Sequence, residues 1–165
     1  MPGQQSGWGH TRLLMALTFR TPREADLDRL LEVHTSAFPD PRGREARVRN
    51  FTRNPLGRFE DLVLACDGDV IVGHAFLFPL EAWFGGARVR VAGIASIGVA
   101  PEARGRGVGS AMLEHLCRTA AARGDAVAVL YAFRQGFYVR AGFATASSYR
   151  RLRLHPSSIP SSWRA

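Results

Sequence analysis

The chain contains only two cysteines, Cys66 and Cys117, among its 165 residues. Two cysteines are too few for a disulfide framework, and each lies in an apolar stretch, so we expect both to pack as free thiols. The sequence also lacks an apolar run long enough to span a bilayer, and residues 1–10 are too polar for a signal peptide. These absences predict a cytoplasmic protein that makes no use of a membrane.

Several ligand-binding motifs are missing as well. No Cys/His cluster has the spacing of a metal site, so we expect no metal. No Gly-x-x-x-x-Gly-Lys-Ser/Thr string is present, which excludes a P-loop. A dinucleotide fingerprint that begins at Gly105 fails, because Ser110 stands where its last glycine should be.

Acidic residues are in the minority. The chain has 14 acidic and 22 basic side chains, all of the latter arginine, and a net charge of +8. Such an excess can attract nucleic acid, but the arginines are spread along the whole chain. No recognition helix, zinc finger or aromatic RNA-binding pattern appears, so nucleic-acid binding is the less favoured alternative. The charge can instead steer an anionic cofactor to the protein.

The length and the 46% hydrophobic content fit one domain with a substantial core. We expect a disordered extension over residues 1–16, a single domain over 17–155 and a loose tail over 156–165. The tail is expected to be loose because it is rich in proline and serine.

Hydrophobic patterning predicts an α+β sheet that is antiparallel first and parallel later. Tight turns at 67–69 and 84–87 favour an antiparallel meander, and a helix between two later strands implies a parallel crossover. Thr21–Glu24 forms a capping box with a proline at the first helical position, which predicts the start of the first helix. The apolar strand at 126–132 is expected to be central and covered on both faces. The expected strands are 17–20, 61–66, 70–82, 88–99, 126–132 and 144–154, and the expected helices are 21–37, 44–53, 109–123 and 133–141.

The most informative segment runs from Ile94 to Ala111 and reads IASIGVAPEARGRGVGSA. It consists of an apolar strand, a proline, a basic glycine-rich turn and the start of a helix. Unpaired backbone N–H groups at the positive end of a helix form an anion site, which here suits a pyrophosphate. Arg104 and Arg106 add positive charge, and the neighbouring glycines permit close backbone approach. The alternative is a glycine-rich connection that binds nothing.

The string from Arg104 to Gly109 resembles the Arg/Gln-x-x-Gly-x-Gly/Ala signature of the GNAT superfamily of N-acetyltransferases. The resemblance implies the GNAT acyl-CoA N-acyltransferase fold, with a mixed, mostly antiparallel central sheet and helices on both faces. It also implies a parallel strand pair that splays apart at a bulge, for which Gly98 is suited. Acetyl-CoA is then the expected co-substrate. The cofactor-binding residues implied by the resemblance are Ile97, Gly98, Val99, Arg104, Gly105, Arg106, Gly107, Val108, Gly109, Ser110, Phe133 and Arg134.

A second motif, Phe137-Tyr138-Val139-Arg140-Ala141-Gly142-Phe143, resembles the family's Phe-Tyr-x-x-x-Gly-Phe stretch. The resemblance implies that an amine attacks the thioester directly and that Tyr138 protonates the leaving thiolate. The alternative is a core tyrosine whose hydroxyl bonds to backbone. The candidates for a general base, none of them preferred, are Ser96, Glu81, His74 and Asp61.

Residues 91–94, 99–107 and 130–138 are similar to the first domain of Eis-like (enhanced intracellular survival) aminoglycoside acetyltransferases. Those proteins continue into a second GNAT-like domain and a sterol-carrier-like domain. We therefore expect an N-acetyltransferase whose acceptor is a primary amine on a small molecule or peptide. The alternative is a catalytically silent acyl-CoA-binding or sensor domain. A homo-oligomer and a monomer both stay open.

Overall fold

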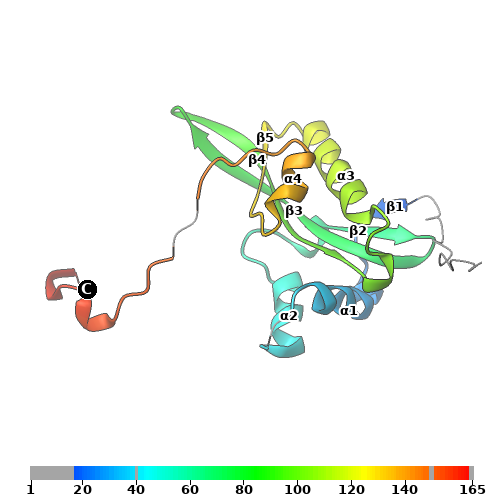
Figure 1. Ribbon diagram of the computed structural model, residues 1–165, viewed down its shortest axis with the longest axis horizontal. Helices are drawn as coiled ribbons and strands as arrows, with labels where there is room; N and C mark the ends of the chain where they lie inside the picture. The colour runs from blue at the N-terminus through cyan, green and yellow to red at the C-terminus, as the bar shows by residue number, and fades with distance from the viewer. Residues whose placement is uncertain (1–16, 40, 149–150, 164–165) are drawn as a thin grey trace, which may run out of the picture. The chain divides into compact units, whose positions relative to one another are not determined.

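The computed structural model describes residues 17–39, 41–148 and 151–163, and within them five strands form one sheet (Figure 1). The strands lie in the order β1-β2-β3-β4-β5; the first four are antiparallel neighbours, and β4 and β5 run parallel. This arrangement confirms the predicted α+β meander with a parallel crossover. The strand bounds are β1 Leu17–Arg20, β2 Leu62–Asp67, β3 Val70–Phe84, β4 Ala87–Val99 and β5 Val127–Leu130.

Two compact units make up the chain, Met1–Phe133 and Arg134–Ala165. The whole sheet belongs to the first unit, together with α1 (Leu27–Ala37), α2 (Gly43–Thr52) and α3 (Val108–Arg123). The second unit contains α4 (Gln135–Arg140) and two short 3₁₀ turns, η4 (Pro156–Ser158) and η5 (Ser161–Trp163). The extension expected over 1–16 lies outside the described residues.

Helices cover both faces of the sheet, with α1 and α2 on one face and α3 on the other (Figure 1). Each buried Leu or Phe contributes roughly 2 kcal/mol of hydrophobic stabilisation, so the apolar stripes of these helices fix them to the sheet. The face under α1 and α2 buries Leu30, Leu31, Phe51, Leu62, Leu64, Phe76 and Phe78. The helix α3 buries Val108, Met112, Leu113, Leu116 and Ala120. None of the helices described is long and apolar enough to cross a membrane.

The first helix starts later than the sequence predicts. A 3₁₀ turn over Glu24–Asp26 precedes α1. Its N-cap is Arg23 rather than Thr21, and the Asp26 carboxylate accepts the Arg23 N–H at 2.6 Å. Arg20 at the end of β1 donates two further hydrogen bonds to the same carboxylate, at 2.6 and 2.8 Å. The predicted capping box at Thr21 is therefore wrong, because the strand before it supplies an arginine that draws Asp26 into the capping position.

The bulge in β4 lies at Ser96 and Ile97 rather than at Gly98. Ala95 faces Phe76 and Gly98 faces His74, so two residues of β4 stand opposite the single residue Ala75. Ser96 accordingly adopts a φ of 52°, in the left-handed region. The parallel pairing of β4 and β5 ends at Ile94, just before this bulge.

Two strand predictions are wrong. β5 lies at the edge of the sheet, because among the described residues no strand pairs with its outer side. Its Val127 and Val129 are exposed rather than covered. The final strand expected over 144–154 does not form at residues 144–148 or 151–154. Its alternating Leu152 and Leu154 are 84% and 68% exposed, so there is no buried face to hold an extended segment in a sheet.

Candidate functional site

A glycine turn joins the end of β4 to the start of α3. After β4 the chain forms a 3₁₀ turn, η3 (Pro101–Ala103), and then passes through two residues in the left-handed region, Gly105 (φ 73°) and Gly107 (φ 81°). A side chain at either position would strain the backbone, which explains the glycines. Gly107 is the N-cap of α3, and the helix begins at Val108, one residue earlier than expected.

Among the described residues, the backbone N–H groups of this turn lack well-formed hydrogen bonds. The first hydrogen bond of α3 runs from Ala111 N–H to the Gly107 carbonyl, at 3.0 Å. From Gly105 to Ser110, no N–H group donates a hydrogen bond of ordinary geometry to any residue that the structure describes. These donors gather at the positive end of a sixteen-residue helix. The turn can therefore receive an anion with several oxygen atoms, such as a diphosphate.

Arg104, the first residue of the motif, is engaged by the protein. Its Nε donates to the Val99 carbonyl at 3.1 Å, and its Nη2 donates to the carbonyl and the hydroxyl of Ser36, at 2.9 and 3.4 Å. The side chain thus ties the turn to the last residues of α1. A second tie runs from Arg29 of α1 to Glu102 in η3 and to the Ile71 carbonyl.

Arg106 also interacts with another side chain of the protein, but it forms fewer hydrogen bonds than Arg104 does. It forms an ion pair with Asp67, the last residue of β2, with Nη2 and Oδ2 3.4 Å apart. Asp67 balances much of the charge that Arg106 brings to the turn. The positive potential at the site therefore comes chiefly from the helix and its free N–H groups.

The predicted contacts at Ile97, Gly98 and Val99 lie on a bare strand edge. Beyond Ile94, β4 pairs with β3 on one side only, and no described strand covers the other side. Unpaired N–H and C=O groups on such an edge can bind a ligand that contains amides, as in strand addition. The structure brings this edge and the glycine turn together, because the edge leads directly into η3.

The candidate bases differ in accessibility. His74 is fully buried, and burial, followed by the nearby His34, lowers its pKa to about 3, so it is both inaccessible and a weak base. Glu81 pairs with Arg88, and Asp61 accepts the Arg58 N–H at 2.7 Å. Ser96 is half-buried at the bulge. Across the residues described, no group of three or more His, Cys, Asp and Glu is placed to hold a metal.

Tyr138 lies on α4 in the second unit, and its side chain is 7% exposed. Its ring makes edge contacts with Phe137 and Phe143, at centroid distances of 5.0 and 6.2 Å. Within residues 134–148 and 151–163, no group hydrogen-bonds its hydroxyl. Burial raises the pKa of Tyr138, so the phenol stays protonated at neutral pH.

The remaining two predicted cofactor contacts flank the boundary between the units. Phe133 follows β5 at the end of the first unit and is 68% exposed. Arg134 opens the second unit as the N-cap of α4, and its carbonyl accepts the Phe137 N–H at 3.0 Å.

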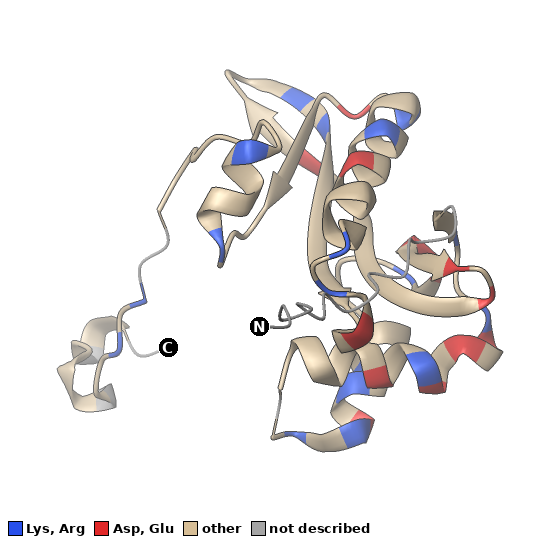
Figure 2. Cartoon of the chain, turned by 45° about the vertical axis from the view of Figure 1, so that its right-hand side comes forward, with Lys and Arg blue, Asp and Glu red and all other residues tan. Residues whose placement is uncertain are grey.

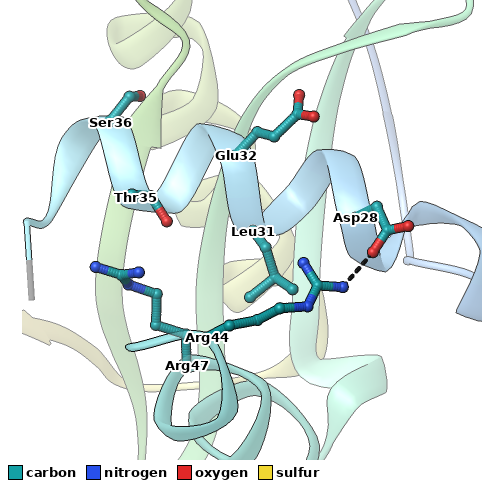
Figure 3. Close-up of a pocket in the computed structure, with 7 residues that line it drawn as sticks. All are labelled: Asp28, Leu31, Glu32, Thr35, Ser36, Arg44 and Arg47. Carbon is teal, nitrogen blue, oxygen red and sulfur yellow. Dashed lines mark hydrogen bonds and ion pairs between the residues drawn. The ribbon is translucent and has the colours of Figure 1, made fainter. Parts of the chain in front are cut away.

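A hollow of about 660 Å³ between α1 and α2 was missed by sequence reasoning (Figure 3). It has charges of both signs, as do the two helices that form it (Figure 2), and Arg44 pairs with Asp28 across it. No local pattern could reveal the hollow, because its walls come from separate helices. The lining residues are Asp28, Leu31, Glu32, Thr35, Ser36, Arg44 and Arg47.

Comparison with known proteins shows that the chain is similar to GNAT acetyltransferases in sequence and in structure. The family model described as "Acetyltransferase (GNAT) domain" matches residues 18–146. A GCN5-related N-acetyltransferase from Kribbella flavida is similar in structure, with 30% identity and a TM-score of 0.65, over 78% of this chain and 33% of that one. One from Anabaena variabilis ATCC 29413 has 25% identity and a TM-score of 0.66, over 76% and 31%. The chain thus spans about a third of the length of these two proteins.

A ribosomal-protein-alanine N-acetyltransferase from Brucella melitensis biovar Abortus 2308 matches over 85% of this chain and 100% of that one. Its TM-score is 0.67 and its identity 18%, which supports a common fold. No curated protein sequence matches this chain.

Proposed function

The chain belongs to the GNAT acetyltransferase family, and from this premise we propose that it is an N-acetyltransferase that moves an acetyl group from acetyl-CoA to a primary amine. The observation that carries the proposal is the row of backbone N–H groups from Gly105 to Ser110, which lack well-formed hydrogen bonds to the described residues. A turn that bound nothing would leave these donors to water alone. A diphosphate would use several of them at once.

The residues present fit this co-substrate in two places. The two left-handed glycines, Gly105 and Gly107, add no side chains to the turn, and no described atom lies within 4 Å of where a Cβ would stand on either. The bare edge of β4 over residues 95–99 can pair with the amides of the pantetheine arm. Bound acetyl-CoA supplies an acetyl group activated as a thioester.

The chain itself must orient the thioester and manage one proton. We assign Tyr138 as the donor of that proton to the leaving sulfur, because its phenol is protonated at neutral pH. The acceptor amine must arrive neutral or lose a proton nearby. Ser96 can order a water for that purpose, whereas His74 is too deeply buried to reach an acceptor.

The similarity to Eis-like first domains remains part of the proposal. It is supported by the two GCN5-related N-acetyltransferases, which are more than twice as long as this chain. Amines of small molecules and of peptides are both suitable acceptors in the proposed reaction. We propose that the protein acts in the cytoplasm.

The test has two stages. Acetyl-CoA should raise the melting temperature of the protein, because a ligand that binds only the folded state stabilises it. A panel of aminoglycosides, polyamines, amino acids and peptides should then release free thiol with at least one acceptor. Stabilisation without release from any amine would favour the catalytically silent acyl-CoA-binding domain. No stabilisation at all would contradict both functions.

A further inference from the structure

We propose that Asp67 is an internal competitor that holds Arg106 away from the diphosphate of CoA and so limits how tightly CoA binds. This inference rests on the proposed function. It concerns a residue that lies outside the glycine turn, at the end of β2, 39 positions before Arg106 in the chain.

The contact between the two side chains is enclosed. The Arg106 and Asp67 side chains are only 18% and 16% exposed, so solvent screens their attraction weakly. Arg106 stands between Gly105 and Gly107, in the middle of the row of free N–H groups. The carboxylate that faces its guanidinium is therefore a negative charge one arginine side chain away from the proposed anion site.

The ion pair also has fewer hydrogen bonds than its groups allow. A guanidinium and a carboxylate can form two parallel hydrogen bonds, but Arg106 donates only one to Asp67, at 3.4 Å. Arg106 Nε and Asp67 Oδ1 are both buried without a hydrogen-bond partner among the described residues. Arg104, by contrast, directs three hydrogen bonds to Val99 and Ser36. Arg106 thus uses fewer of its donors within the described residues than Arg104 does.

The direction of the effect follows from charge. Asp67 repels a diphosphate, and it also neutralises the cation that would attract one. Both effects weaken CoA binding, so removal of the carboxylate should strengthen it. A weaker grip favours the release of free CoA after transfer, a step that limits turnover in many enzymes.

The experiment compares Asp67→Asn with Asp69→Asn by calorimetric titration with CoA. Asp69 lies in the same turn, is exposed, and loses the same charge on substitution. We expect Asp67→Asn to lower the Kd about three- to tenfold and Asp69→Asn to change it by less than about twofold. In an Arg106→Gln background, the gain from Asp67→Asn should shrink to less than about twofold.

A second ligand identifies the phosphate involved. With 3′-dephospho-CoA, which keeps the diphosphate, the gain should persist. If the gain disappears, the 3′-phosphate is the group concerned and the inference is overturned. An unchanged or higher Kd in folded Asp67→Asn overturns it too, provided that the unsubstituted protein binds CoA.

If the unsubstituted protein does not bind CoA, the proposed function itself is contradicted, and the inference fails with it. Should Asp67→Asn fail to fold, Asp67→Ser serves in its place, with the same expected gain. Far-ultraviolet circular dichroism establishes that each variant is folded.

Discussion

His74 on β3 leaves no room for a side chain at Gly98 on β4. A Cβ at Gly98 would lie 2.6 Å from His74 Nε2, closer than two such atoms can approach. The imidazole is fully buried, and within the described residues neither of its nitrogens has a hydrogen-bond partner. The two residues are opposite each other in the strand register, just past the bulge. The packing of His74 therefore sets the position of the bare strand edge proposed to bind CoA.

Substitution of Gly98 by alanine tests this close contact. We expect Gly98→Ala to destabilise the protein by about 1–3 kcal/mol, as overpacked core sites do, and to raise the KM for acetyl-CoA. Gly136→Ala is the matched control, because its new methyl would approach nothing closer than Arg140 Nη1 at 3.7 Å. Urea unfolding measures both. Equal stability of the two variants would contradict the contact.

Burial of His74 predicts a pH dependence of stability. Its pKa falls from 6.5 to about 3 in the folded state, first because of desolvation and then because of His34. Below pH 6.5 the unfolded chain takes up a proton that the folded chain refuses, so this contribution to stability is lost as the pH falls toward 3. The slope is at most about 1.4 kcal/mol per pH unit.

The measurement is the free energy of unfolding in urea at several pH values, for the unsubstituted protein and for His74→Leu. As the pH falls below 6.5, the free energy of unfolding should decrease more for the unsubstituted protein than for His74→Leu. A difference that stays constant with pH would mean that His74 titrates alike in both states.

Tyr138 provides a test of catalysis separate from binding. We expect Tyr138→Phe to lower kcat by about tenfold or more, since the proton donor is lost, while the Kd for CoA stays unchanged. Tyr131→Phe removes the hydroxyl of an exposed tyrosine and should alter neither quantity. An unchanged kcat in Tyr138→Phe would exclude the phenol as the proton donor.

The two ends of α3 offer a matched pair of glycines. Gly107 at the N-cap and Gly124 at the C-cap have φ values of 81° and 82°, and nothing lies within 4 Å of a Cβ on either. Alanine at each should therefore destabilise the protein similarly, by about 1–2 kcal/mol. Only Gly107→Ala should weaken CoA binding, as titration calorimetry can establish. A similar loss in Gly124→Ala would attribute the effect to stability alone.

Local patterns predicted much of this fold, because they depend on neighbours in the sequence. The helix expected over 44–53 appears as α2 (Gly43–Thr52), and the glycine turn after β4 leads into a helix as expected. Turn residues and helical spacing carry such information within a few positions.

What could not be predicted depends on distant partners. The bulge at Ser96 is fixed by the pairing of β4 with β3, and the edge position of β5 depends on which strands lie beside it. The roles of the two motif arginines were hidden for the same reason. Arg104 bonds to Ser36, 68 residues away, and Arg106 pairs with Asp67.

The proposed CoA site depends most on the backbone amides from Gly105 to Ser110, and nuclear magnetic resonance can observe them directly. In a titration of ¹⁵N-labelled protein with CoA, we predict that the amide signals of these residues shift downfield and saturate together, because each N–H gains an acceptor. CoA binding that shifts other amides and leaves these six unmoved would contradict the central claim.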